Sequence, residues 1–371
     1  MTKLIPGIPA RAWLEVDLAA LVRNARRFRE LIGAPLLPMV KANGYGLGAV
    51  AVARALESAD PWGYGVATVE EAAELRSAGI ARPLIVFTPL TAEPAAVPAF
   101  RELGLRPVIA DLAALESWIA GAGGPFHVEI DTGMSRSGFP WRDREALGAL
   151  GARLAGAAGW EGVFTHFHSA ETDPASSVAQ MERFREVLTA LPRRPSVVHF
   201  ANSAAAGLGP GSGGDLARPG IFLYGGGTDP RRPGPEPVAR LRARVVAVRK
   251  LQPGDSVSYG AEWTARIPTT VATLSIGYAD GVLRSLSNRG LVELNGALVS
   301  IAGRVTMDML MVDAGNTPVA IGDVASLFGG SLSLDEQAVR AGTNSYELLT
   351  AVSARVSRVY LPESRDQAGS P

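Results

Sequence analysis

The sequence predicts an α/β chain, a (β/α)₈ barrel of the TIM type followed by a C-terminal, mostly β domain. The chain has 371 residues, 47% of them hydrophobic, which exceeds the usual size of one core. Between residues 36 and 225, short apolar β-rich runs alternate with segments of helical spacing. After Tyr224 the runs are strand-like and close with turn signals. For the first part, an open doubly wound sheet is the competing architecture.

Eight apolar runs of the first part are expected to be strands. They cover residues 36–42, 64–68, 83–88, 105–110, 126–132, 160–167, 197–202 and 215–218. Between them, segments such as 69–79, 111–123 and 179–191 place apolar residues on one helical face. Eight alternations of strand and helix favour a closed barrel.

A Gly- and Pro-rich segment, GGGTDPRRPGPEP, separates the two expected domains, which we place at residues 1–235 and 236–371. The second contains strand-like runs such as LRARVVAVRKL and MLMVDAG, with turns at Pro253-Gly254-Asp255 and Asn295-Gly296. A short amphipathic helix is expected within SYELLTAVSARVSRVY. The strand-like run 11–18 precedes the barrel and can pair with the β domain.

Composition excludes several classes of protein. The 36 basic and 36 acidic residues cancel, so the chain has no electrostatic reason to bind nucleic acid or an anionic membrane. No apolar stretch reaches the ~18 residues of a membrane span, and no secretory signal begins the chain, so we expect a cytoplasmic location. Without cysteine there are no disulfides, thiolate nucleophiles or cysteine-ligated metals, and no metal site is expected.

Lys41 stands out because it follows the apolar run LLPMV and leads into the glycine-rich ANGYGLG. Only Lys3 and Lys250 accompany it, since the other 33 basic residues are arginine. Unlike a guanidinium, a desolvated amine can lose its proton and form a Schiff base with a carbonyl. The alternative is a lysine that snorkels from the end of a strand.

In a barrel, catalytic side chains lie at the C-terminal ends of the strands. Unusual polar residues fall at those ends here: Lys41, residues 131–136, His166, Asn202-Ser203 and residues 218–220. Barrel enzymes often hold a phosphate with the loops after the last two strands, which here contain Ser203 and Gly220. An aldehyde that carries a phosphate, pyridoxal phosphate, fits both features.

Nine motifs, in order and at consistent spacing, resemble those of the alanine racemases. They are PMVKANGYGLG, DTGMSRSG, THFHSAE, HFANSAA, RPGIFLYG, SVSYGAEWTA, SIGYADG, GRVTMDM and RVSRVY. The resemblance spans nearly the whole chain. It implies a homodimeric pyridoxal-phosphate enzyme that interconverts L- and D-alanine through a Schiff base and supplies D-alanine for peptidoglycan.

Other functions remain as alternatives. A racemase of serine or of several amino acids would share the motifs. A non-catalytic pyridoxal-phosphate protein would resemble the barrel alone. The related decarboxylases of basic amino acids use a cysteine, and this chain has none. Metal-assisted D-amino-acid lyases would need a ligand cluster in the second domain, yet all four histidines precede residue 200.

The resemblance also assigns roles to single residues. Lys41 is the Schiff-base lysine and one of two catalytic bases, and Tyr259, from the other subunit, is the second. The expected phosphate contacts are Tyr45, Ser203, Gly220, Ile221 and Tyr360. The expected contacts to the ring and its substituents are His166, Asn202, Arg218 at the pyridine nitrogen, and Arg136 at the phenolic oxygen. The expected substrate contacts are Arg136, Met307 and Tyr278.

Two of these roles also follow from the chemistry of the side chains. Arg218 only donates hydrogen bonds, so a pyridine nitrogen that faces it must accept one and stay unprotonated. The weaker electron sink should suppress transamination. Racemisation also needs bases on opposite faces of the substrate, because a single base tends to return the proton to the face it left.

The chain departs from the family pattern at three positions. Where many relatives carry a carbamylated lysine beside Arg136, this chain has Glu129. We expect Glu129 to supply the carboxylate directly, with the ordinary glutamate pKa near ~4.3. In the lysine motif, Gly44 and Leu47 stand where Ala and His would be expected.

Overall fold

The computed structural model describes residues 10–91, 95–121, 123–204, 211–227 and 234–362. They fall into two compact units. The barrel unit is drawn from Ala25–Gly44 and Ala49–Leu223. The β unit is drawn from Met1–Asn24, Tyr45–Gly48 and Tyr224–Pro371.

The barrel unit is built on parallel strands that neighbour one another in chain order. They are β2 (Tyr64–Val66), β3 (Leu84–Val86), β4 (Leu105–Ile109), β5 (Phe126–Asp131), β7 (Trp160–Phe164) and β8 (Val197–His199). Single parallel bridges extend this sheet at both edges, from Met39 to Gly65 and from His199 to Leu216. A third bridge, between Leu36 and Ala217, joins the two extensions. The strands and bridges together close a ring, so the predicted barrel is confirmed and the alternative, an open sheet, is wrong.

Burial explains why these short runs become strands. Every residue of β2, β3 and β8 is buried, as expected for parallel strands covered on both faces. One cluster in the ring draws a side chain from six of its eight strand positions: Leu37, Ile85, Val108, Phe164, Val197 and Leu216. This part of the barrel interior is therefore packed with apolar side chains.

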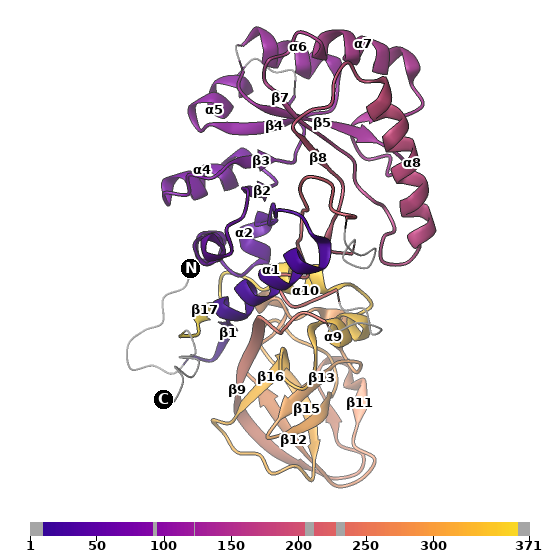
Figure 1. The fold of residues 1–371 in the computed structure, drawn as a ribbon. Helices are drawn as coiled ribbons and strands as arrows, with labels where there is room; N and C mark the ends of the chain where they lie inside the picture. The colour runs from indigo at the N-terminus through magenta and orange to yellow at the C-terminus, as the bar shows by residue number, and fades with distance from the viewer. Residues whose placement is uncertain (1–9, 92–94, 122, 205–210, 228–233, 363–371) are drawn as a thin grey trace, which may run out of the picture. The chain divides into compact units, whose positions relative to one another are not determined.

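Helices alternate with these strands along the chain. They are α1 (Leu18–Ile32), α3 (Ala49–Leu56), α4 (Val69–Ser77), α5 (Ala96–Glu102), α6 (Leu112–Ala120), α7 (Arg144–Leu154) and α8 (Pro174–Ala190). Helices α4 to α8 lie outside the strands (Figure 1). The predicted helices 69–79 and 111–123 are confirmed as α4 and α6. The third begins five residues before the expected 179, because Asp173 caps it and Pro174 occupies its first turn.

The first expected strand, 36–42, differs from the prediction. Proline lacks an N–H group, so Pro35 and Pro38 interrupt the donor pattern and isolated bridges replace a regular strand. Val40 donates to the Gly65 carbonyl at 2.8 Å, which is the last contact before the chain turns. Lys41 does not end a strand; it opens α2 (Lys41–Tyr45), which has left-handed backbone angles inside it.

The β unit contains a closed antiparallel ring. Its strands are β9 (Ala239–Leu251), β12 (Thr269–Leu274), β13 (Leu291–Leu294), β14 (Ala297–Ile301), β15 (Leu310–Gly315) and β16 (Val324–Phe328). The order is β12-β15-β14-β13-β16-β9, and β9 returns to pair with β12. The predicted turn at Asn295-Gly296 joins β13 to β14.

Both ends of the described chain join this sheet. β1 (Ala12–Val16) pairs antiparallel with β9 and parallel with β17 (Ser357–Tyr360). Run 11–18 therefore pairs with the β sheet, as its sequence allowed. The expected amphipathic helix is α10 (Ser345–Ala351). Helix α9 (Leu334–Ala341) was not predicted, although Ser333 and Glu336 form a capping box at its start.

Candidate active site

Lys41 is a half-buried amine in the barrel unit. Within the described residues its side chain makes no hydrogen bond and no ion pair. Burial lowers the pKa of Lys41, the positive charge of Arg136 lowers it further, and Glu71 acts in the opposite direction. The net effect is a lowered pKa, which increases the neutral fraction of the amine, the form that attacks a carbonyl.

The turn after Lys41 is left-handed, with φ angles of 53°, 54° and 62° at Ala42, Asn43 and Gly44. Such a backbone costs roughly 1–2 kcal/mol for each non-glycine residue. Two side chains hold it: Glu71 accepts the Ala42 N–H at 2.6 Å, and Asn43 accepts the Ala49 N–H at 3.0 Å. The departure at Gly44 has a structural reason, since a Cβ there would lie 3.1 Å from the Ala49 backbone.

Arg218 is a buried guanidinium, 3% exposed, surrounded by neutral acceptors. It donates to the carbonyls of Thr165 and Phe200 at 2.9 and 3.2 Å, and to His199 Nδ1 at 2.8 Å. Burial lowers the pKa of Arg218 to about 9, so the group stays charged at neutral pH. Its Nε–H has no acceptor in the part of the chain that the structure describes.

His166 lies against the same guanidinium, with Arg218 Nη2 and His166 Nδ1 3.2 Å apart. Because Arg218 only donates, Nδ1 must be the acceptor and Nε2 must carry the imidazole proton. Burial and the charges of Arg218, Arg136 and Lys41 lower the pKa of His166 to about 3. The imidazole is therefore neutral.

The loops predicted to hold a phosphate meet at Ser203. Its hydroxyl oxygen accepts the backbone N–H groups of Gly220 at 2.8 Å and Phe222 at 3.3 Å, on either side of the fully buried Ile221. No acceptor is recorded for the hydroxyl hydrogen among the described residues. Asn202 turns back and accepts the Ala204 N–H at 3.1 Å.

Arg136 is exposed on the loop after β5, which Asp131 orders by accepting the N–H of Gly133 at 2.9 Å and of Ser135 at 3.1 Å. The positive charge of Arg136 lowers the pKa of Lys41 and the pKa of Glu129.

Glu129 departs from the expectation. It is 5% exposed and accepts a hydrogen bond from Ser137 Oγ at 2.7 Å. Across the described chain no hydrogen bond joins it to Arg136. Burial raises the pKa of Glu129, against the opposing effects of Ser137 and Arg136. The expected ordinary pKa is therefore wrong, because the side chain is shielded from water.

In the β unit, Tyr259 is 72% exposed and opens a short 3₁₀ turn (η3, Tyr259–Ala261). Ser258 and Ala261 on either side have φ angles of 69° and 47°. Ser258 Oγ anchors the turn by donating to the Arg304 carbonyl at 2.8 Å. Strained backbone of this kind persists where neighbouring structure over-determines it, and it is common at functional sites.

Tyr278 and Met307 occupy adjoining loops of the β unit. Tyr278 N–H donates to the Thr306 carbonyl at 2.9 Å, and Ala279 N–H donates to the Met307 carbonyl at 3.0 Å. The side chains of Tyr278 and Met307 are 44% and 53% exposed. Two of the three predicted substrate residues are thus neighbours in the β unit.

Tyr45 and Tyr360 also belong to the β unit. Tyr45 is 5% exposed and stacks on Tyr224, with ring centroids 4.3 Å apart. Its hydroxyl has no hydrogen-bond partner among the residues described. The Tyr360 hydroxyl donates to the Leu47 carbonyl at 2.9 Å, so a phosphate would compete with that carbonyl for its proton.

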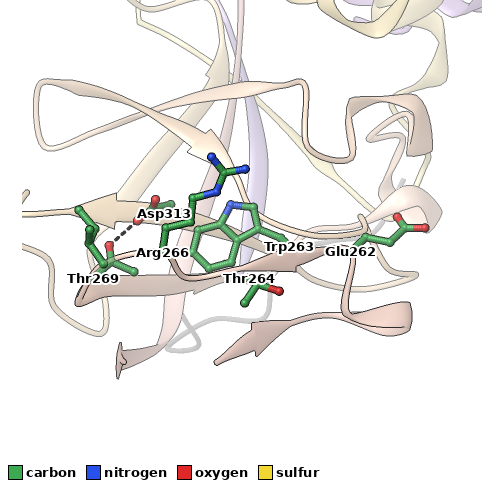
Figure 2. A pocket seen from close by; sticks show the side chains of 7 residues that line it. Glu262, Trp263, Thr264, Arg266, Thr269 and Asp313 are labelled. Carbon is green, nitrogen blue, oxygen red and sulfur yellow. Dashed lines mark hydrogen bonds between the residues drawn. The ribbon is translucent and has the colours of Figure 1, made fainter. Parts of the chain in front are cut away.

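A separate pocket of the β unit lies between β11 (Trp263–Thr264), β12 and β15, and Figure 2 shows the side chains around it. Glu262, Trp263, Arg266, Thr269 and Asp313 are among its lining residues, and the Thr269 hydroxyl donates to Asp313. None of the residues predicted from the sequence to form the active site lines this pocket.

Two family models cover almost all of the chain. The model of the alanine racemase N-terminal domain matches residues 16–228, and that of the C-terminal domain matches residues 238–360. The chain belongs to the alanine racemase family. The sequence resemblance is thereby confirmed.

Individual alanine racemases are similar over nearly the whole chain. That of Deinococcus radiodurans is 39% identical, with 94% of this chain and 98% of the relative covered. The biosynthetic enzyme structure from Pseudomonas aeruginosa is 35% identical with a TM-score of 0.87, covering 95% of this chain and 100% of that one. The Bartonella henselae structure with covalently bound pyridoxal phosphate is 31% identical with a TM-score of 0.86, at the same coverages.

The donor set of this alanine racemase family member fits pyridoxal phosphate. Among the described residues, the barrel unit offers an amine without a hydrogen bond or ion pair at Lys41, and a buried guanidinium whose Nε–H has no acceptor at Arg218. It also offers a hydroxyl hydrogen without an acceptor at Ser203 among the described residues. An aldehyde, a ring nitrogen and a phosphate are the groups that such donors would bind.

The described residues contain neither a membrane-spanning helix nor a cluster of metal ligands. No helix there is both long and apolar enough to cross a membrane. No group of three or more potential His, Cys, Asp or Glu metal ligands occurs there either.

Proposed function

We propose that this protein interconverts L- and D-alanine with pyridoxal phosphate attached to Lys41, and so supplies D-alanine for peptidoglycan. The observation that carries the proposal is the half-buried Lys41 amine, which makes no ion pair among the described residues and has a lowered pKa. Membership of the alanine racemase family supports the reaction. A racemase of serine or of broader specificity is the second candidate.

The barrel unit would bind the cofactor through several groups. Arg218 would donate to the ring nitrogen, and Ser203 with the Gly220 and Ile221 backbone would face the phosphate. The remaining proposed cofactor contacts are Tyr45, Arg136, His166, Asn202 and Tyr360. When bound, pyridoxal phosphate supplies an electron-withdrawing ring that acidifies the substrate Cα–H.

The chain's own groups then move the proton. Lys41 takes the Cα proton from one face or returns it there, and Tyr259 does the same on the other face. Arg218 keeps its proton at neutral pH, so a ring nitrogen bound to it would accept a hydrogen bond and stay unprotonated. Arg136, Met307 and Tyr278 would position the substrate.

We propose that the active protein is a homodimer in which Tyr259 serves the partner's site. Exposed apolar side chains on adjoining loops of the β unit support this interface: Tyr259, Tyr278, Met307 and Met309. Single exposed apolar residues are common, but a group of them typically marks an interaction surface. A cytoplasmic location and a domain boundary near residue 235 belong to the same proposal.

Borohydride reduction followed by peptide mapping tests the cofactor site. The label is expected on Lys41. The Lys250→Ala protein is the matched control, because Lys250 is exposed on β9. Label on Lys250 or Lys3, or no label, would end the proposal.

Substrate choice is tested by racemisation assays across a panel of L- and D-amino acids. We expect alanine to react fastest. Faster turnover of serine would favour the second candidate. Cofactor binding without any racemisation would indicate a pyridoxal-phosphate protein that is not a racemase.

A further inference from the structure

A continuous line of hydrogen bonds crosses the interior of the barrel unit from Arg218. Arg218 Nη1 lies 2.8 Å from His199 Nδ1, and His199 Nε2 lies 2.8 Å from His127 Nδ1. His127 Nε2 lies 3.1 Å from Glu161 Oε2. Both histidines are fully buried, and they come from β8 and β5. Glu161, on β7, is the carboxylate end of the line.

The chemistry of the two ends determines where every proton of the line lies. Arg218 can only donate, so His199 Nδ1 accepts and His199 Nε2 carries a hydrogen. That hydrogen points to His127 Nδ1, which must accept, so the proton of His127 is also on Nε2. Glu161 accepts it when ionised. All donors therefore point from Arg218 towards Glu161.

We propose that Glu161 and His127 are positioning residues that orient Arg218 through His199, with both imidazoles held neutral and protonated on Nε2. Neither Glu161 nor His127 makes a hydrogen bond to Arg218 itself, so both act through His199. Their effect on the cofactor ring rests on the proposed function, whereas the proton arrangement does not.

The charge of Arg218 explains why such a line is needed. A buried guanidinium is costly without compensation, and the direct acceptors of Arg218 are carbonyls and imidazoles. Glu129 attracts it through space, while Arg136 repels it. A carboxylate at the end of a hydrogen-bonded chain polarises the bonds and strengthens each of them by about 10–30%. Glu161 thus makes His199 Nδ1 a stronger acceptor for Arg218.

Glu161 is itself held as an anion. Arg106 Nε donates to it at 2.7 Å and Arg106 Nη2 at 3.3 Å. Burial raises the pKa of Glu161, but the hydrogen bonds from His127 and Arg106 outweigh it, so the pKa lies below the ordinary value. Arg106 in turn lies over the Trp62 ring, 5.4 Å from its centroid.

The backbone beside Glu161 is shaped for His127. Strand β7 places Gly162 opposite His127 in the parallel register. A Cβ at Gly162 would lie 2.1 Å from His127 Nδ1, a contact that no side chain could make. The imidazole therefore occupies a space that only glycine leaves open at this position.

Nitrogen-15 spectra of the full-length protein, labelled at histidine, test the proton arrangement directly. The exposed His168 is first removed with His168→Asn. Arg218 also donates to His166, so all three remaining imidazoles should show the neutral Nε2–H form across roughly pH 6 to 9. An Nδ1–H or doubly protonated signal among them would overturn the proposal. This measurement needs neither catalysis nor bound cofactor.

A second measurement tests the positioning role. Glu161→Gln keeps the shape and removes the charge, and Glu116→Gln is the control, since Glu116 pairs with Arg153 on the barrel exterior at 2.9 Å. Relative to the control, Glu161→Gln should shift the imidazole Nδ1 resonances and weaken pyridoxal phosphate binding by roughly three- to tenfold. Unchanged resonances and affinity would make Glu161 merely structural. Failure of the parent protein to bind pyridoxal phosphate would end the proposed function and leave the resonance test intact.

Discussion

Glu71 is expected to hold Lys41 in place through the backbone. Its two carboxylate oxygens accept the N–H of Ala42 at 2.6 Å and of Ala67 at 2.7 Å. The substitution Glu71→Gln leaves one acceptor oxygen and turns the other position into a donor. One backbone N–H would then face an amide NH₂ group.

The expected loss follows from these contacts. A hydrogen bond to a charged group contributes about 1.5–3 kcal/mol, and the second bond weakens when the charge is removed. We therefore expect Glu71→Gln to lower the free energy of unfolding by about 2–3 kcal/mol. The left-handed backbone costs roughly 1–2 kcal/mol at each of Ala42, Asn43 and Tyr45. The hydrogen bond from Ala42 N–H to the Glu71 carboxylate is one of the contacts that offset this cost, and the substitution weakens it.

Urea unfolding of Glu71→Gln and Glu74→Gln measures this loss, because Glu74 is exposed on the same helix and carries the same charge. The control should change stability by less than about 0.5 kcal/mol. Glu71 raises the pKa of Lys41, so its removal should also move the pH profile of pyridoxal phosphate attachment to lower pH. Equal stability and equal profiles in the two variants would refute the reasoning.

Three further predictions concern other parts of the molecule. Glu129→Gln should impair cofactor or substrate handling, and the parent protein's activity should be indifferent to bicarbonate; unchanged kinetics in the variant would show that the carboxylate has no such role. Because the pKa of Glu129 is raised, its contribution to stability is present below its unfolded pKa and is lost as pH rises through the folded pKa, so Glu129→Gln should flatten this part of a stability-against-pH curve. Mixing inactive Lys41→Ala and Tyr259→Phe proteins should restore some activity if Tyr259 serves the partner's site, and no recovery despite proven subunit exchange would contradict that. Asp280→Ala should cost about 3 kcal/mol in urea unfolding, since this fully buried carboxylate is shared by two arginines, whereas the exposed Asp308→Ala should cost about 1 kcal/mol or less.

Local sequence determined the elements and the chemical character of the candidate site. Strand runs such as 83–88 and 105–110 are mainly apolar, as suits strands that the barrel buries. Helices begin after residues such as Thr68 and Asp111, whose side chains cap the first turn. The rarity of lysine singled out Lys41 for the same local reason, since an amine can do what a guanidinium cannot.

The tertiary structure decided the contacts between residues distant in the chain. His127 and His199 lie 72 positions apart in the chain, yet their rings are hydrogen-bonded. They meet because both strands pair with β7, which sets His127 opposite Gly162 and His199 opposite Phe164. No spacing in the sequence encodes that register. The left-handed turn at Lys41 likewise depends on Glu71, 29 positions beyond Ala42. Glu129 looked like an ordinary carboxylate until the fold buried it, because desolvation is a property of the packed neighbourhood.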